Sequence, residues 1–252
     1  MNRRVRSTWK TIAATAAAVA VAVCGSATAA QAASIKVIDY PNFNSGPALS
    51  LQGAASVVKP TGQPKVLRLV KSDNHTAGAA WAAHKISPTK PFITTFVGQI
   101  ATGAVHGDGI AFVIQGAGNK ALGWDGGGMG YSGIKSSVAV EFDTYKNSYD
   151  ISDNHVAIVT GGNAEVQAAS ANAPRALAGQ PFRGTISYEP LTKTLQVFVN
   201  AGNSTLPGTL VLSRTIDIAA AVGSGPVHVG FTAANGSNYS AQDIDSWTMF
   251  AG

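Results

Sequence analysis

Short runs of β-branched, aromatic and aliphatic residues recur along the chain at steady intervals, separated by glycine, asparagine, aspartate, serine and proline. This pattern predicts many strands joined by turns, in a sandwich or a barrel. The expected strands are residues 36–40, 48–52, 65–70, 92–100, 109–115, 137–144, 155–160, 184–188, 194–200, 209–215, 227–233 and 244–250.

Within several runs the pattern has a period of two. Val138, Val140 and Phe142 alternate with Ala139 and Glu141. Such alternation is typical of antiparallel sheets with one face in the core. The all-β class follows, because parallel βαβ units would need helical runs between the strands and none is present.

Two segments are candidates for helix. Residues 217–222 form a short apolar segment that Asp217 can cap and Gly223 can close, so we expect a single helical turn there. The Ala-rich segment 164–173 is expected to be a loop.

The first residues resemble an export signal. Four basic side chains within residues 1–10 precede an Ala- and Val-rich run, 11–30, and then the small-residue site Ala30-Gln31-Ala32. We expect residues 1–32 to be a signal peptide and 33–252 to be one secreted, extracellular domain. A membrane anchor is the alternative, but Thr, Gly and Ser dilute the run, and no later stretch approaches the ~20 apolar residues that a span needs.

Removal of this segment changes the charge balance. Of the 18 basic residues four lie within it and 14 remain, against 13 acidic residues, a net charge of +1. No cluster of Lys or Arg remains that could bind nucleic acid or an anionic membrane. Cys24, the one cysteine, is removed too, which excludes disulfides and thiol chemistry.

Acidic residues cluster at one place. Glu141, Asp143, Asp150 and Asp153 lie within a thirteen-residue window, although the chain has only 13 acidic residues. Glu141 and Asp143 are two apart at the end of an expected strand, so their side chains share a face. Crowded carboxylates repel one another unless a divalent cation lies between them. The window therefore predicts a metal site.

The residue types indicate which metals could bind. Carboxylates, the amide of Asn147 and a backbone carbonyl suit calcium, whereas His155 indicates a second, transition-metal position, with manganese favoured and zinc as the alternative. A solvated acidic turn with a surface histidine is the other interpretation.

The segment 140–155 resembles the metal-binding segment of the legume lectin (L-type lectin) family, Val-Glu-Phe-Asp-Thr followed by an aromatic residue, Asn, Asp and His. The resemblance is to a secreted, microbial-type member. Further segments match in order across nearly the whole expected domain, and they are residues 43–51, 66–69, 96–99, 107–112, 126–131, 229–236 and 245–250.

This resemblance implies an antiparallel jelly-roll sandwich of the concanavalin-like type that binds calcium and manganese. The implied metal ligands are Glu141 and His155 for the transition metal, Asp143 and Asp150 for both ions, and the Tyr145 carbonyl and Asn147 for calcium. Here Ile151 replaces the family's usual proline, so Asp153 competes with Asp150. Gly161-Gly162 also replaces a polar segment that supports the transition metal in the family.

The resemblance also implies a sugar site. Asp108, after a cis Gly107-Asp108 peptide, would accept from two hydroxyls, and the Gly127 N–H and the Asn147 amide would donate. Tyr145 would cover the apolar face of the sugar. The last loop, 235–242, would shape specificity, with Asn235 and Gly236 at its start.

Two other functions compete with this lectin prediction. A glycan hydrolase on the same sandwich would continue Glu141-Phe142-Asp143 with a second glutamate, but Tyr145 and Lys146 stand there instead. A non-catalytic adhesion or matrix protein without sugar binding is the third possibility. The expected partners are glycans or glycoconjugates. Because a single sugar site is weak, a homo-oligomer would add avidity, and the sequence identifies no interface for it.

Overall fold

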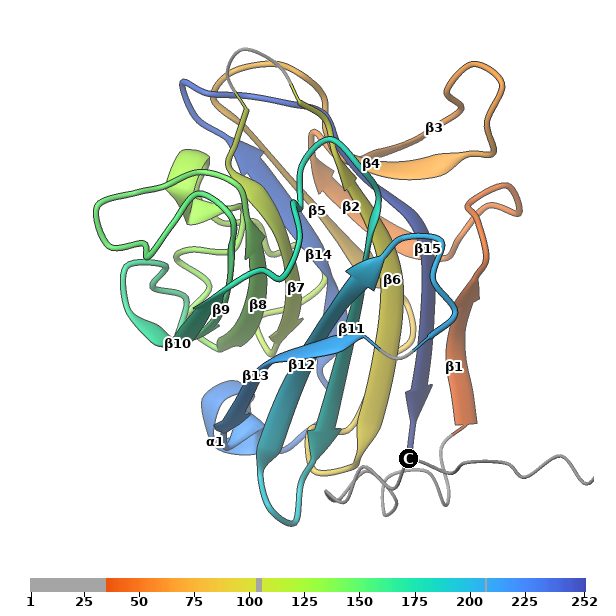
Figure 1. Cartoon of the computed structure of the whole chain (residues 1–252). Coiled ribbons are helices and arrows are strands. Elements are labelled where there is room, and N and C mark those ends of the chain that lie inside the picture. Colours follow the sequence, from red (N-terminus) through yellow and green to blue (C-terminus); the bar gives the residue numbers. More distant parts are fainter. Residues whose placement is uncertain (1–34, 103–105, 207) are drawn as a thin grey trace, which may run out of the picture.

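The computed structural model describes residues 35–102, 106–206 and 208–252; the expected signal peptide, residues 1–32, lies outside them. The described residues form two antiparallel sheets packed face to face (Figure 1). The expected all-β sandwich is confirmed. Within this part of the chain, no helix is both long and apolar enough to cross a membrane.

The two sheets interleave in sequence. Sheet A has the strand order β13-β12-β11-β6-β15-β4-β3, with β1 also paired to β15, and sheet B has the order β10-β9-β8-β7-β14-β5-β2. Sheet A contains β1 (Ile35–Tyr40), β3 (Ser56–Val58), β4 (Val66–Val70), β6 (Phe92–Ile100), β11 (Phe182–Glu189), β12 (Thr194–Ala201), β13 (Thr209–Thr215) and β15 (Gln242–Ala251). Sheet B contains β2 (Leu49–Gly53), β5 (Thr76–Ala82), β7 (Gly109–Gln115), β8 (Ser137–Asp143), β9 (His155–Thr160), β10 (Gln167–Asn172) and β14 (His228–Asn235).

An aromatic cluster fills the space between the sheets. Phe96 of sheet A meets Phe231 of sheet B with ring centroids 4.8 Å apart, and Phe231 meets Trp247 at 4.9 Å. Edge-to-face pairs of this kind add stability beyond the area that they bury. Val138, Val140 and Phe142 face this core, as their alternation predicted.

The opposite face of sheet B is also buried. Ala139 and Val159 pack there with Met129, Tyr131 and Ile134 in a second apolar cluster beneath the loops. The polar half of the alternating pattern in β8 therefore points into a covered layer and not into solvent. Glu141 and Asp143 lie on this covered face, which makes their burial a property of the fold.

Three strands were not expected from the sequence: β3, β5 and β10. β5 is rich in Ala and Gly, which have low strand propensity, yet packing requires small residues, because a Cβ atom at Gly78 would lie 1.9 Å from the Leu69 carbonyl oxygen. The loop expected at 164–173 is a correction: residues Gln167–Asn172 pair with β9 as an edge strand.

The expected helical turn is present. Helix α1 spans Ile218–Val222, and the Asp217 carboxylate accepts a hydrogen bond from the Ala220 N–H at 3.0 Å. Gly223 follows with φ of 95°. The cap and the stop signal were thus both readable from the sequence.

β15 is irregular at Asp245. Ile244 pairs with Gly98 and Ser246 with Val97, so Asp245 is the extra residue of a β-bulge. Its carboxyl is half-buried. Burial, and secondarily the nearby Asp243, raise the pKa of Asp245 to about 6.

This raised pKa predicts a stability difference for Asp245→Asn. The folded state holds the proton between pH ~4 and about 6 while the unfolded state has lost it, so stability falls as the pH rises through that range. The full difference would be worth about 3 kcal/mol, which solvent screening reduces to about 1 kcal/mol. In urea unfolding we expect the variant to be the more stable protein at pH 7 and equal to wild type below pH ~4. An unchanged gap between the two proteins at both pH values would contradict this assignment.

Candidate functional site

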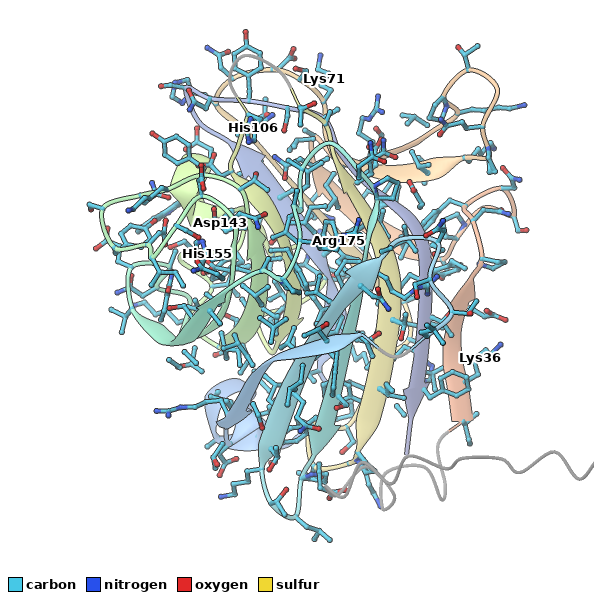
Figure 2. The ribbon with its side chains drawn as sticks, in the orientation of Figure 1. Lys36, Lys71, His106, Asp143, His155 and Arg175 are labelled. Atoms are coloured by element: carbon cyan, nitrogen blue, oxygen red, sulfur yellow. The ribbon has the colours of Figure 1, made fainter. Side chains whose placement is uncertain are left out.

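The buried acidic residues gather at one end of β8 and β9. Asp143 and His155 are directly opposed in these paired strands, and Glu141 precedes Asp143 on the same face. The loop between the strands returns Asp150 to them. Ligand atoms of Asp143, Asp150 and His155 all lie within 4.8 Å of one another (Figure 2 shows Asp143 and His155 beneath the loops). Asp143, Asp150 and His155 are thus brought together in one cluster by the fold.

Asp150, and not Asp153, joins this cluster. Its Oδ1 atom lies 3.5 Å from His155 Nε2, and both side chains are fully buried. Its Oδ2 atom accepts a hydrogen bond from the Asn147 N–H at 2.7 Å. Asp153 is exposed to solvent. Of the two aspartates that the sequence left open, Asp150 is therefore the one placed to bind the same metal ion as Asp143.

Glu141 is also buried, at 2% exposed, but it is not among the three residues whose ligand atoms lie within 4.8 Å of one another. Burial raises the pKa of the Glu141 carboxyl to about 7, while the hydrogen bond donated by the Tyr131 hydroxyl and the charge of His155 lower it. Burial, followed by the charge of Glu141, raises the pKa of the Asp143 carboxyl well above its ordinary value. Both carboxylates are therefore costly to ionise without an added positive charge.

The donor set fits divalent cations. Among the described residues, no Lys or Arg forms an ion pair with Glu141, Asp143 or Asp150. The Asn147 Oδ1 atom is buried and accepts no hydrogen bond. Carboxylates, an amide oxygen and one imidazole are ligands that calcium and manganese accept.

A second group of predicted residues adjoins this cluster. The Gly107-Asp108 peptide is cis, as the resemblance implied, and Asp108 is 4% exposed. The Thr144 N–H, one residue after Asp143, donates to the Asp108 carbonyl at 2.9 Å. The Gln242 amide donates to the Gly107 carbonyl at 2.8 Å. Asp108 is thus held between the end of β8 and the start of β15.

The Asp108 carboxylate has an oxygen atom that is free to accept a hydrogen bond. Its Oδ2 atom is buried with no hydrogen-bond partner. Burial raises the pKa of the carboxyl to about 6; the Gly236 N–H lowers it, and Asp125 and Asp150 raise it. A desolvated acceptor without a donor is typical of a ligand-binding group.

Glycines bring three loops close to Asp108. A Cβ atom at Gly127 would lie 3.0 Å from both Nδ2 and Oδ1 of Asn147. A Cβ atom at Gly236 would lie 3.2 Å from the Gly126 Cα and 3.6 Å from Asp108 Oδ2. Side chains at these positions would fill the space in which Asp108, Gly127 and Asn147 converge.

Of the other two residues predicted to bind sugar, Tyr145 lies beside Asp108, whereas the Asn235 side chain is bonded to a neighbouring loop. A Cβ atom at Gly107 would lie 3.2 Å from the Tyr145 Cβ, so Tyr145 borders the cis peptide and remains partly exposed. Asn235 is fully buried, and its amide donates to the carbonyls of Lys71 and Asp73 at 2.8 and 2.9 Å. Its side chain anchors a loop below the surface and does not reach the group, whereas the Gly236 backbone does.

Three side chains at the site were not singled out from the sequence. Tyr131 bonds to Glu141. Gln167 donates to Asp150 Oδ1 at 2.8 Å and lies 3.4 Å from His155 Nε2. The Tyr149 hydroxyl donates to the Gly127 carbonyl at 3.4 Å. Gln167 lies on β10, where no strand was expected, so its approach depends on a pairing that its local sequence does not signal.

The family follows from a sequence comparison as well as from the fold. The family described as the legume lectin beta-barrel domain matches residues 39–247, and this chain belongs to it. The domain is a lectin-type binding domain and not an enzyme, which removes the hydrolase alternative.

Several relatives share this domain. A bark agglutinin of Robinia pseudoacacia is 30% identical over 164 residues, covering 63% of this chain and 58% of the relative. An L-type lectin-domain receptor kinase of Oryza sativa subsp. japonica is 28% identical over 185 residues, covering 69% of this chain but 26% of the kinase. The chain therefore spans about half, or less, of the length of these two curated relatives.

A solved structure gives the same picture. The lectin from Bauhinia forficata in complex with GalNAc superposes with a TM-score of 0.72 at 26% identity, over 87% of this chain and 99% of that one. All three relatives are plant proteins, so they give no support to the microbial type expected from the sequence.

Proposed function

We propose that this domain binds carbohydrate through Asp108, the Gly127 N–H and Asn147, with Tyr145 as the apolar plate and Gly236 at the rim. The observation that carries the proposal is the convergence of these groups on a buried carboxylate oxygen without a partner. Sugar hydroxyls present vicinal donors and acceptors, which such a set can satisfy. The GalNAc in the Bauhinia lectin complex supports the ligand class.

Calcium and manganese support this site in the proposal. Glu141 and His155 would hold the transition metal, Asp143 and Asp150 both ions, and the Tyr145 carbonyl and Asn147 calcium. The ions supply the positive charge that the buried carboxylates lack. The Asn147 side chain would bind both calcium and the sugar. The backbone N–H of Asn147 donates a hydrogen bond to the Asp150 carboxylate at 2.7 Å, which links the proposed sugar site to a proposed metal ligand.

The same proposal includes export. The basic and then apolar order of residues 1–32 supports a signal peptide, leaving 33–252 as one secreted domain. Millimolar affinity for a monosaccharide would make several linked copies useful, which favours a homo-oligomer.

Tyr131→Phe is expected to weaken transition-metal binding about 10- to 100-fold, because Glu141 loses the hydrogen bond that the Tyr131 hydroxyl donates while it remains buried. Titration with Mn²⁺ measures this change. Tyr149→Phe is the matched control, since Tyr149 contacts the Gly127 carbonyl and not Glu141. Equal manganese affinity in Tyr131→Phe and wild type would remove Glu141 from the ligand set.

The function is tested on a glycan array before and after chelation with EDTA. We expect retention on a subset of glycans that disappears with EDTA and returns with Ca²⁺ and Mn²⁺. Retention that resists complete metal removal would contradict the metal-supported site. The absence of binding to any glycan in the presence of both ions would favour the adhesion alternative.

A further inference from the structure

A separate pocket lies on the outer face of sheet A, away from the acidic cluster of sheet B. It has a volume of about 280 Å³. Four apolar and five polar or charged residues line it, among them Pro64, Val97, Gln63, Lys65 and Asp245. Hydrogen bonds hold two of its rims together, because the Phe43 N–H donates to the Lys65 carbonyl at 3.1 Å and the Lys65 N–H donates to Asn44 Oδ1 at 2.9 Å. The pocket is therefore a built depression and not a gap between free loops.

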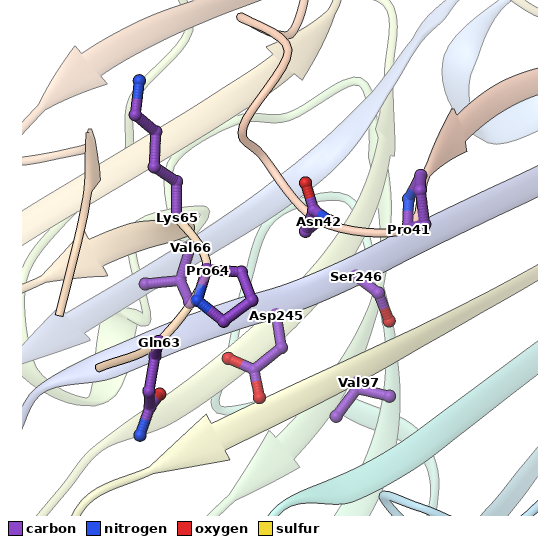
Figure 3. Close-up of a pocket in the computed structure, with 9 residues that line it drawn as sticks. All are labelled: Pro41, Asn42, Gln63, Pro64, Lys65, Val66, Val97, Asp245 and Ser246. Atoms are coloured by element: carbon purple, nitrogen blue, oxygen red, sulfur yellow. The ribbon is translucent and has the colours of Figure 1, made fainter. Parts of the chain in front are cut away.

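The Asp245 carboxylate enters this pocket because of the bulge in β15. Figure 3 shows it lying between Gln63 and Val97, whereas Lys65 extends away from it. No hydrogen bond or ion pair to the Asp245 carboxylate occurs among the described residues. Arg68, the nearby guanidinium, is committed to Asp243 by two hydrogen bonds of 2.8 Å. Asp245 is thus a half-buried anion without a counter-ion.

The surroundings of Asp245 select one class of ligand. A hard divalent cation favours several carboxylates, and the pocket offers one, beside neutral amide and hydroxyl groups. A sugar needs an aromatic plate, and no aromatic side chain lines the pocket. Proline and valine walls suit an aliphatic stem, and the amide of Gln63 can accept an additional N–H.

We propose that this pocket binds a small organic cation, an alkylammonium compound whose charged nitrogen pairs with Asp245 and whose aliphatic stem packs between Pro64 and Val97. The ammonium group would be the counter-ion that Asp245 lacks among the described residues. The pocket volume of about 280 Å³ accommodates a stem of a few carbons. This site is independent of the proposed sugar site, since the two share no residue.

The test uses three probes of four carbons each: n-butylammonium, n-butanol and butyrate. Each is titrated into the calcium- and manganese-loaded protein and followed by NMR. We expect saturable binding of butylammonium with a dissociation constant on the order of millimolar, together with little response to butanol or butyrate. Equal binding of butanol, or no saturation by butylammonium, would overturn the proposal.

Substitutions test whether butylammonium binds at Asp245. Asp245→Asn keeps the shape and removes the charge, so butylammonium affinity should fall at least about tenfold. Asp39→Asn is the matched control, because it removes an exposed carboxylate of the same sheet that pairs with Lys36. Val97→Phe, which fills the pocket and retains Asp245, should also abolish binding. Unchanged affinity in Asp245→Asn, or displacement of the amine by a bound sugar, would contradict the assignment.

Discussion

Replacing Asp108 by asparagine is expected to abolish glycan binding while the fold and the metal content stay unchanged. Asparagine has the same shape, but one carboxylate oxygen becomes an N–H₂ donor, so hydroxyl groups that donated to Asp108 lose their acceptor. A hydrogen bond to a charged group is worth about 1.5–3 kcal/mol. The loss of one such bond, together with the weakening of the other when the charge is removed, predicts a fall in affinity of at least about tenfold.

Affinity for immobilised glycans and metal content are measured together on this variant. Asp125→Asn is the control, because Asp125 is an exposed carboxylate whose charge also acts on Asp108 and whose side chain lies 3.3 Å from His75. It should retain binding within a few-fold. If Asp108→Asn bound glycans as wild type does, the sugar site would lie elsewhere, although the metal proposal would stand.

Removal of divalent cations is expected to lower thermal stability as well as glycan binding. Glu141, Asp143 and Asp150 are at most 7% exposed, so without an ion they must either bind protons or repel one another. An ion present at a hundred times its dissociation constant adds about 2.7 kcal/mol. Two ions would then raise the midpoint of thermal unfolding by about 10 to 20 °C in a domain of this size.

This effect is measured by thermal unfolding of the EDTA-treated protein and of the same protein after ions are restored. Asp143→Asn should behave like the chelated protein and respond little to added Ca²⁺ or Mn²⁺, because Asp143 would bind both ions. Asp39→Asn, an exposed substitution, should respond as wild type does. A folded protein without metal whose melting midpoint ignores both ions would refute the proposed role of the acidic cluster.

Local patterns in the sequence predicted most of the sandwich. Strands such as β7 and β8 consist of residues that favour extended structure, and Asp217 and Gly223 mark the ends of α1. β5 and β10 escaped prediction because Ala and Gly carry little strand signal. β5 and β10 form because neighbouring strands offer hydrogen bonds, and in β5 the close approach of the Leu69 carbonyl leaves no space for a side chain at Gly78.

The candidate site shows the same division. Glu141 and Asp143 could be assigned to one face from the period of a strand, and the glycine loop and cis peptide could be expected from resemblance. The choice of Asp150 over Asp153, the commitment of the Asn235 amide to a neighbouring loop, and the approach of Gln167 depend on loop paths. A loop path follows from packing across the whole domain, which no local pattern records.

By itself the sequence determined the all-β class, the clustering of acidic residues, and the family to which the domain belongs. These properties follow from residue type and spacing along one chain. Only the tertiary structure decided that the outer face of β8 is covered and that Asp108 retains an unpaired buried oxygen. It also decided that the β-bulge directs the Asp245 side chain toward a pocket. The reason is that burial and the supply of partners are set by segments far apart in sequence, brought together when the two sheets close over their core.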